Sequence, residues 1–253
     1  MRDVLQDLSD GKITIVEAEA KLLGYATSEA GRFDVAREQR HGVPEGILCD
    51  GKTTEEIVTL ASIALETTGR AIITRTTPEI QEAVKENLPK SVELHSYSTP
   101  RIIVAKTLGF EPPVLDATIA IVTAGTSDRP VAEEAAIIAS EMGASIVQIR
   151  DVGVAGLHRL LDQIEVIRSA DVAIVAAGRE GTLPSLVAGL VATPVIGLPV
   201  STGYGLGGSG EAALTSMLQS CAVLTTVNID AGFVAGAQAG MIAKSISQAR
   251  TQK

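Results

Sequence analysis

The sequence contains no tryptophan, three tyrosines and three phenylalanines, so aromatic residues make up only 2% of its 253 residues. Hydrophobic residues nevertheless account for 45% of the chain, so the core has to be packed with alanine, valine, isoleucine and leucine. Glycine is abundant, with 24 residues. This composition excludes a disordered chain and is typical of an α/β protein with a well-buried core.

Cysteine is also scarce. Cys49 and Cys221 are the only two, which is too few for a disulfide framework, and they lack the spacing of a metal-ligand motif. We expect both to be free thiols. Lys and Arg (21) are outnumbered by Asp and Glu (30), giving a formal net charge of −9. Because this charge repels polyphosphate, we do not expect nucleic acid as a partner.

Long apolar runs are absent as well. No segment reaches the roughly 20 apolar residues of a membrane span. The N-terminal segment MRDVLQDLSDGKIT is charged and lacks the apolar core of a signal peptide. We therefore expect a cytoplasmic protein that does not associate with a membrane.

The Pro112-Pro113 pair is the best candidate for a domain boundary, because consecutive prolines cannot continue a helix. We place the boundary near residue 115. Residues 1–115 are then expected to form a helical and small α/β domain, in which Thr14 and the Thr77-Pro78 pair begin helices. Its expected strands cover residues 47–49, 71–74 and 92–95.

Beyond the boundary, in residues 116–253, apolar segments alternate regularly with helical patterns. The expected strands cover residues 118–122, 145–149, 172–176, 194–198 and 223–227, and the expected helices cover 130–142, 156–169, 211–219 and 232–249. Strands that are apolar on both faces and separated by helices predict a three-layer, doubly wound parallel sheet of the flavodoxin-like type.

Four glycine-containing loops follow the strands of this expected sheet. They are TAGTSD (123–128), DVGVAGLHR (151–159), AAGREGTLP (176–184) and STGYGLGGSGE (201–211). Ligands of open parallel sheets bind beyond the carboxyl ends of the strands, so these loops are where we expect the site. None of them is a P-loop or a GxGxxG after a first strand. Phosphate binding and simple helix capping by Ser127 or Asp128 both remain open for the first loop.

The series TAGTSD, AAGREGTLPSLVAGL and PVIGLPVS resembles the PurE family of aminoimidazole ribonucleotide carboxylases and mutases over roughly residues 116–253. The segments FDVAREQRHGVPE, CDGKT and STGYGLGG, together with residues 221–236, narrow the resemblance to the LarB family and extend it over nearly the whole chain. One departure from PurE is the second loop, where Asp151-Val152-Gly153 replaces the catalytic histidine and His158 follows several residues later.

The LarB resemblance implies a pyridinium-3,5-biscarboxylic acid mononucleotide synthase, the first enzyme towards the nickel-pincer nucleotide cofactor of lactate racemase. Such an enzyme carboxylates nicotinic acid adenine dinucleotide with CO2 as co-substrate and then hydrolyses the phosphoanhydride to release AMP. The resemblance also makes Cys221 the candidate nucleophile, with Glu180 as the candidate base. On the residues alone, Cys221 also fits a buried core thiol and Glu180 a solvated loop charge.

The other candidate ligands of the dinucleotide come from the same loops and from the basic N-terminal segment. They are Gly125, Ser127, Asp128, Asp151, Gly178, Arg179, Gly181, Thr182, Ser201, Gly203, Gly205, Arg37, Arg40 and Lys52. Asp128 and Ser127 are expected to bind ribose or phosphate, and Arg179 to hold a carboxylate or phosphate with its planar fork.

Mg²⁺ is compatible with phosphoanhydride chemistry, but no cluster of ligands in the sequence demands a metal. The PurE resemblance further implies a homo-oligomer, an octamer by analogy. Two alternatives remain open: a PurE-type carboxylase or mutase acting on aminoimidazole ribonucleotide, and a non-catalytic nucleotide-binding module.

Overall fold

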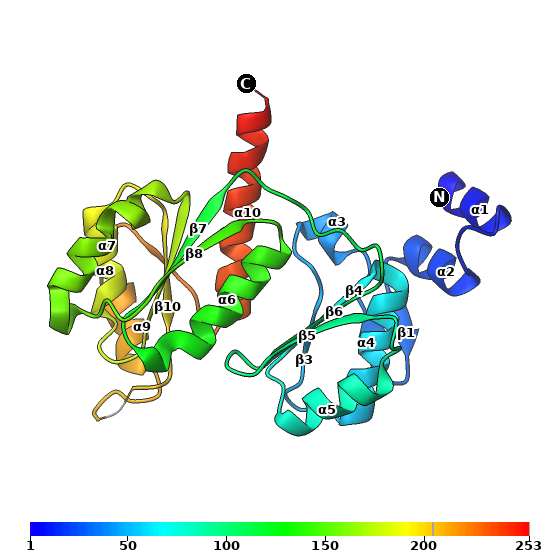
Figure 1. Ribbon diagram of the computed structural model, residues 1–253, viewed down its shortest axis with the longest axis horizontal. Helices are drawn as coiled ribbons and strands as arrows, with labels where there is room; N and C mark the ends of the chain where they lie inside the picture. The colour runs from blue at the N-terminus through cyan, green and yellow to red at the C-terminus, as the bar shows by residue number, and fades with distance from the viewer. Residues whose placement is uncertain (204, 253) are drawn as a thin grey trace. The chain divides into compact units, whose positions relative to one another are not determined.

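The computed structural model describes residues 1–203 and 205–252. The chain divides into two compact units, Met1–Glu111 (unit 1) and Pro112–Lys253 (unit 2), and the division falls at the Pro112-Pro113 pair (Figure 1). Each unit has a hydrophobic core of its own. The chain is therefore an α/β protein with a smaller N-terminal unit, as the sequence predicts.

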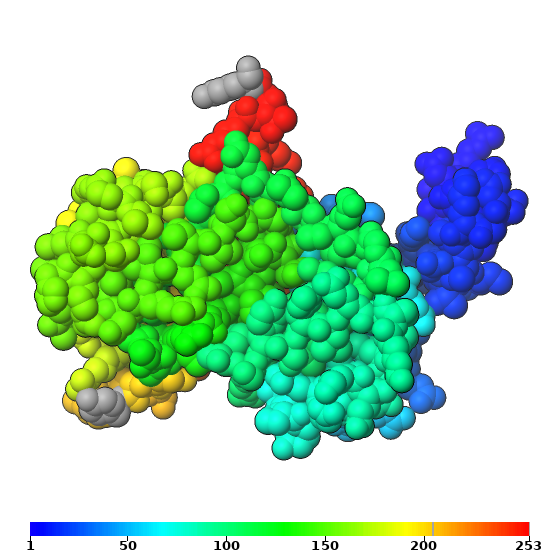
Figure 2. Space-filling view, in the orientation of Figure 1, coloured from blue at the N-terminus to red at the C-terminus, as the bar shows by residue number. Residues whose placement is uncertain are grey.

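Unit 1 begins with two short helices and continues as a mixed α/β arrangement. Its elements are α1 (Arg2–Ser9), α2 (Ile15–Leu23), β1 (Ala26–Ser28), β2 (Gly31–Phe33), α3 (Arg37–His41), β3 (Gly46–Leu48), α4 (Thr54–Thr68), β4 (Arg70–Thr74), α5 (Pro78–Asn87), β5 (Glu93–Tyr97) and β6 (Ile102–Lys106). Helix α1 has no buried residue and projects from the rest of the unit (Figure 2).

The helix starts of unit 1 follow the sequence closely. Thr14 caps α2 in a capping box with Glu17, and Thr77 caps α5 with Pro78 in its first turn, so both expected starts are confirmed. Helix α4, which begins after a second capping box formed by Thr53 and Glu56, buries an apolar face against the sheet.

The main sheet of unit 1 is mixed, with the strand order β3-β4-β6-β5. Strands β3 and β4 are parallel, whereas β6 is antiparallel to both β4 and β5. Strand β6 and the β1–β2 hairpin were not expected from the sequence. Cys49 is buried in this core, where burial raises the pKa of its thiol to about 11. That thiol is therefore protonated at neutral pH.

Unit 2 alternates strands and helices. Its elements are β7 (Thr118–Thr123), η1 (Thr126–Asp128), α6 (Arg129–Glu141), β8 (Ser145–Ile149), η2 (Val154–Gly156), α7 (Leu157–Ser169), β9 (Val172–Ala177), α8 (Thr182–Leu190), β10 (Val195–Pro199), α9 (Glu211–Leu218), β11 (Thr225–Thr226) and α10 (Gly232–Thr251). The strands form one five-stranded sheet in the order β11-β10-β9-β7-β8, and every pair is parallel. The expected doubly wound sheet is thus confirmed, in the flavodoxin-like order.

Helices cover both faces of this sheet, which makes three layers (Figure 1). On one face, alanines of α6 and α10 such as Ala135 and Ala239 pack against Ile119 and Ile174. On the other face, side chains of α7, α8 and α9 pack against the opposite side of the same strands. Burying one such large aliphatic side chain contributes about 1.5–3 kcal/mol, so the sheet is fixed from both sides.

Two details of unit 2 differ from the expectations. The last strand was expected over residues 223–227, but only Thr225 and Thr226 pair with β10, and Val223 is exposed. Helix α8 was not expected, although Pro184 lies in its first turn, where a proline removes no helical hydrogen bond. In the described residues, 1–203 and 205–252, no helix has both the length and the apolar character needed to cross a bilayer.

Candidate functional site

A pocket of about 270 Å³ lies at the carboxyl ends of the strands of unit 2. Its lining comes from the loops after β7, β8, β9 and β10. Strands β7 and β9 are neighbours in the sheet, but α6, which follows β7, and α8, which follows β9, cover opposite faces. The crevice left at such a topological switch point is where open α/β sheets bind their ligands.

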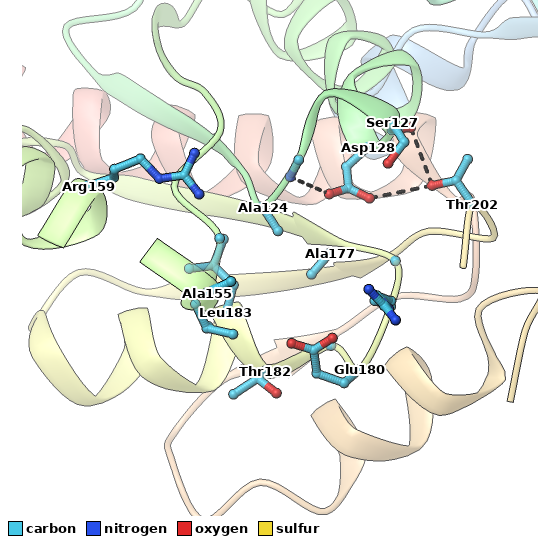
Figure 3. A pocket seen from close by; sticks show the side chains of 16 residues that line it. Ala124, Ser127, Asp128, Ala155, Arg159, Ala177, Glu180, Thr182, Leu183 and Thr202 are labelled. Atoms are coloured by element: carbon cyan, nitrogen blue, oxygen red, sulfur yellow. Dashed lines mark hydrogen bonds between the residues drawn. The ribbon is translucent and has the colours of Figure 1, made fainter. Parts of the chain in front are cut away.

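Asp128 connects three of these loops. Its Oδ2 accepts a hydrogen bond from the backbone N–H of Gly125 at 2.8 Å, and the Thr202 hydroxyl donates to its Oδ1 at 3.5 Å (Figure 3). Burial raises the pKa of Asp128, and hydrogen bonds from Gly125, Thr202 and the Gly178 backbone oppose that rise. Asp128 is therefore a buried carboxylate held in place by the loops after β7, β9 and β10.

Two glycines let the loop after β9 pass close to its neighbours. A Cβ on Gly178 would lie 3.0 Å from both Asp128 Oδ1 and the carbonyl oxygen of Val200. Gly181 has φ +65°, and a Cβ there would lie 2.5 Å from the carbonyl oxygen of Ala213. A side chain at either position would push the loops apart, so these glycines are required by the shape of the pocket.

Arg179 and Glu180 lie between these two glycines and line the pocket. Both side chains are exposed. The carboxylates of Glu180 and Asp128 both border the space at the centre of the pocket in Figure 3. Partial desolvation would favour Glu180 as a base, but in the single chain its carboxylate is in contact with solvent, as expected for a solvated loop charge. The buried carboxylate of the site is Asp128.

Arg159 is the basic residue on the opposite wall of the pocket (Figure 3). It lies in the first turn of α7, and its Nη1 donates to Oδ2 of Asp151 at 2.5 Å. Asp151 has a left-handed backbone with φ +57° and lines a shallower neighbouring pocket, which Arg159 also borders. The sequence pattern did not single out Arg159, although its place just after a strand-to-helix loop marks the same edge of the sheet.

The structure brings together about half of the candidate residues. Those that line the pocket are Gly125, Ser127, Asp128, Gly178, Arg179, Glu180, Gly181 and Thr182. Ser201, Gly203 and Gly205 follow β10 at the same edge but do not line it, and Tyr204 of that loop lies outside the described residues. Residues that line the pocket without having been candidates include Thr202, Gly153, Val154, Ala155 and Leu183.

Cys221 is not part of this pocket. It follows α9 and precedes β11, so it lies at the amino edge of the parallel sheet, whereas the pocket lies at the carboxyl edge. Its side chain is exposed, so the alternative of a buried core thiol is wrong. Within one chain, Cys221 and the pocket therefore lie at opposite edges of the sheet.

Arg37, Arg40 and Lys52 belong to unit 1, where each already has a local partner. Arg37 forms an ion pair with Glu45 at 3.0 Å and Arg40 one with Asp34 at 2.5 Å. The Lys52 ammonium donates to the Leu48 carbonyl at 2.9 Å.

Among the residues that the structure describes, no group of three or more His, Cys, Asp and Glu side chains is arranged to hold a metal ion. Asp128 and Glu180 alone do not make a divalent-cation cage, which needs six or more oxygen ligands from protein, substrate and water. The described side chains therefore do not form a metal cage of their own.

Two known protein families match this chain, one in each of its two units. Residues 25–107 match the family of LarB/PurE-like N-terminal domains, and residues 118–253 match the AIR carboxylase family. The chain belongs to the LarB family, with a PurE-like C-terminal domain. An uncharacterized protein of Methanocaldococcus jannaschii is 36% identical over 252 residues, covering 96% of this chain and 97% of that protein.

A second relative of this LarB-family chain is the N5-carboxyaminoimidazole ribonucleotide mutase of the same organism. It is 36% identical over 119 residues, which cover 45% of this chain and 71% of the mutase. The domains thus identify a carboxylase-type enzyme.

Proposed function

We propose that the protein is a pyridinium-3,5-biscarboxylic acid mononucleotide synthase. It carboxylates C5 of the pyridinium ring of nicotinic acid adenine dinucleotide with CO2 and hydrolyses the phosphoanhydride to release AMP, the first step of nickel-pincer nucleotide synthesis. The observation that carries this proposal is the combination in one chain of a LarB/PurE-like N-terminal domain with an AIR carboxylase domain. We also propose that it acts in the cytoplasm as a homo-octamer.

The charges of the pocket suit such a substrate. Its pyridinium ring is cationic, whereas its carboxylate and phosphates are anionic. Asp128 and Glu180 offer carboxylates to the cationic ring and to ribose hydroxyls, while Arg159 and Arg179 offer guanidinium forks to the anionic groups. The volume of about 270 Å³ lies just below the range of about 300–1,000 Å³ that is typical of small-molecule sites. We assign it to the mononucleotide half of the substrate, which is the half that reacts.

The chemistry requires a nucleophile because a pyridinium cation cannot attack CO2. A thiolate that adds to C6 forms the S–C bond and moves one electron pair onto the ring nitrogen, which neutralises the ring. C5 is then an enamine carbon and forms a C–C bond with CO2. Loss of the C5 proton to a base and departure of the thiolate restore the aromatic ring, so no oxidant or reductant is consumed.

Glu180 is the proposed base for the C5 proton. It lines the pocket, and its exposure allows it to pass the proton on to solvent. Asp128 is held by Gly125 and Thr202, which suits a carboxylate that orients ribose better than one that moves during turnover. Ser127 and Thr182 also line the pocket and provide further hydroxyls.

The PurE reaction is the second candidate, supported by the similarity to the mutase over 119 residues. Offering the purified protein nicotinic acid adenine dinucleotide or aminoimidazole ribonucleotide, each with bicarbonate, separates the candidates. The proposal predicts AMP from the dinucleotide and no carboxylation of the aminoimidazole. Carboxylation of the aminoimidazole alone would establish the PurE reaction, and turnover of neither would indicate a binding module.

A further inference from the structure

Beside the main pocket lies a second, shallower pocket, which the proposed carboxylation leaves unused. Its volume is about 350 Å³. The end of β8 and the loop after it form one side of this shallow pocket, and the first two turns of α7 form the other. Arg159 lines both pockets, so the two cavities meet at this side chain.

The surroundings of Arg159 fix its guanidinium group at this junction. Its Nη1 donates to Oδ2 of Asp151 at 2.5 Å. Gly156 gives the side chain room, because a Cβ at that position would lie 2.6 Å from Nε of Arg159. Asp151 is held in turn, since its backbone N–H donates to Oγ1 of Thr123 at 3.3 Å. Arg159 therefore holds a planar fork that suits an anionic group lying between the two pockets.

The other polar side chains of the shallow pocket match the parts of an adenylate group. Arg150 is a second cation, Asp162 offers a carboxylate, and Gln148 and Gln163 offer amides. A glutamine amide can pair with N6 and N7 of adenine, and a guanidinium plane can stack on the base. A carboxylate accepts hydrogen bonds from ribose hydroxyls. Phosphate, ribose and base thus each have a partner of suitable chemistry.

These side chains are already ordered by contacts with one another. Arg150 donates through Nη2 to the amide oxygen of Gln148 and to Oε1 of Glu133, the latter at 3.2 Å. A guanidinium group carries five N–H donors, so donors remain for a ligand. On the side formed by α7, the Gln163 amide donates to Oδ2 of Asp162 at 2.8 Å. Groups that are held in place before binding lose less conformational entropy when a ligand arrives.

We propose that the shallow pocket binds the adenylate half of the dinucleotide, with the phosphoanhydride lying across Arg159. This inference rests on the proposed function, because it takes the dinucleotide as the substrate. The main pocket, with about 270 Å³, is assigned to the mononucleotide half, so the other half needs an adjoining cavity of similar size. The shallow pocket is such a cavity, and it lies on β8, the edge strand of the sheet.

Binding of AMP alone provides the first test and needs no turnover. AMP is titrated into the purified full-length protein in a calorimeter, and nicotinic acid mononucleotide is titrated separately. The wild type should bind AMP. The Arg150→Met, Gln163→Leu double variant should bind AMP about tenfold more weakly, whereas its Kd for the mononucleotide should change by less than about twofold.

The matched control is the Gln238→Leu, Lys244→Met double variant, which removes an amide and a cation from exposed positions of α10. It should bind both nucleotides as the wild type does. A wild-type protein that does not bind AMP would overturn the inference. An equal loss of affinity for AMP and the mononucleotide in the Arg150→Met, Gln163→Leu variant would overturn it as well.

Steady-state kinetics show whether the AMP bound in this pocket represents half of the substrate or a separate nucleotide. The Arg150→Met, Gln163→Leu variant should raise KM for the dinucleotide about tenfold and change kcat by less than about twofold, because it removes contacts to the part that does not react. An unchanged KM in a variant that has lost AMP binding would indicate a site for free adenine nucleotides and overturn the inference. Selective loss of AMP binding in a protein without turnover would uphold the adenylate site and place the fault with the proposed function.

Discussion

Arg159 and Asp151 form an ion pair, with 2.5 Å between Nη1 and Oδ2, at the wall between the main pocket and its shallower neighbour. The pair orients the guanidinium fork so that its remaining N–H groups are available to an anionic group of the substrate. Arg159→Lys should raise KM for the dinucleotide about tenfold while changing kcat less, because an ammonium cannot reproduce the planar fork.

Steady-state kinetics at constant ionic strength measure this effect. Asp151→Asn is the control, since it removes the partner charge but leaves Arg159 in place, and its rise in KM should be smaller. An unchanged KM in a folded Arg159→Lys protein would mean that the ion pair only shapes the loop.

The second prediction concerns Asp128, whose pKa is raised by burial above its ordinary value of 3.8. The folded state then holds the proton more tightly than the unfolded state, so this group stabilises the fold below pH 3.8 and that contribution is lost as the pH rises through the raised pKa. Asp128→Asn does not titrate. Urea unfolding gives the free energy of unfolding of both proteins at each pH. The difference between them should shift in favour of the Asn variant as the pH rises from 4 to 7, because only the wild type loses this contribution.

A difference in stability that does not vary with pH would contradict the raised pKa. Asp128→Ala is the companion variant. It leaves the partly buried N–H of Gly125 without its acceptor, which should cost about 1–3 kcal/mol near pH 4 and less towards pH 7, because alanine does not titrate either.

Asp171 should show the opposite pH dependence. Burial tends to raise the pKa of Asp171, but hydrogen bonds from Arg250 and the Thr118 backbone outweigh burial, and its pKa is lowered from 3.8. Its contribution is therefore present above pH 3.8 and lost as the pH falls through the lowered folded pKa. Asp171→Asn should reduce the free energy of unfolding by about 1 kcal/mol near neutral pH. The loss should be no larger because the partner Arg250 is exposed, and solvent screens the ion pair.

The loss caused by Asp171→Asn should disappear in acid. Urea unfolding followed by circular dichroism at neutral pH and near pH 3 checks both parts of the prediction. A loss of equal size at the two pH values would show that packing, and not the carboxylate charge, is responsible.

The two cysteines should differ sharply in function. Cys221→Ser should abolish carboxylation, because a serine hydroxyl is scarcely ionised near neutral pH and is a far poorer nucleophile than a thiolate. Cys49→Ser should retain the reaction but unfold more easily, since a hydroxyl would replace a buried thiol. Product formation and the melting temperature of both variants distinguish the roles. Full carboxylation by a folded Cys221→Ser protein would remove the covalent step.

Much of unit 2 could be predicted because its strands are apolar on both faces and alternate regularly with helices. Unit 1 was harder. Its strand β6 (Ile102–Lys106) ends in a lysine and pairs antiparallel with two neighbours, so no strand–helix alternation marks it. Helix α8 was obscured by Gly181 and Pro184, which are loop residues in most contexts but here begin a helix.

The site was predictable only in part, for a physical reason. The rule that loops after parallel strands gather at one edge correctly brought together the segments around Asp128 and Glu180. The same rule, applied to Cys221, would have placed it at the other edge, because it follows a helix and precedes a strand. The exposure of Glu180 depends on what covers the pocket, which no pattern along one chain encodes.

The measurement that tests the central claim most directly is mass spectrometry of the products formed from nicotinic acid adenine dinucleotide and carbon-13 bicarbonate. The account predicts AMP together with a pyridinium mononucleotide that carries two carboxylates, one of them labelled. AMP accompanied by unlabelled nicotinic acid mononucleotide would reduce the activity to phosphoanhydride hydrolysis. Recovery of the intact dinucleotide from the folded protein would contradict the account altogether.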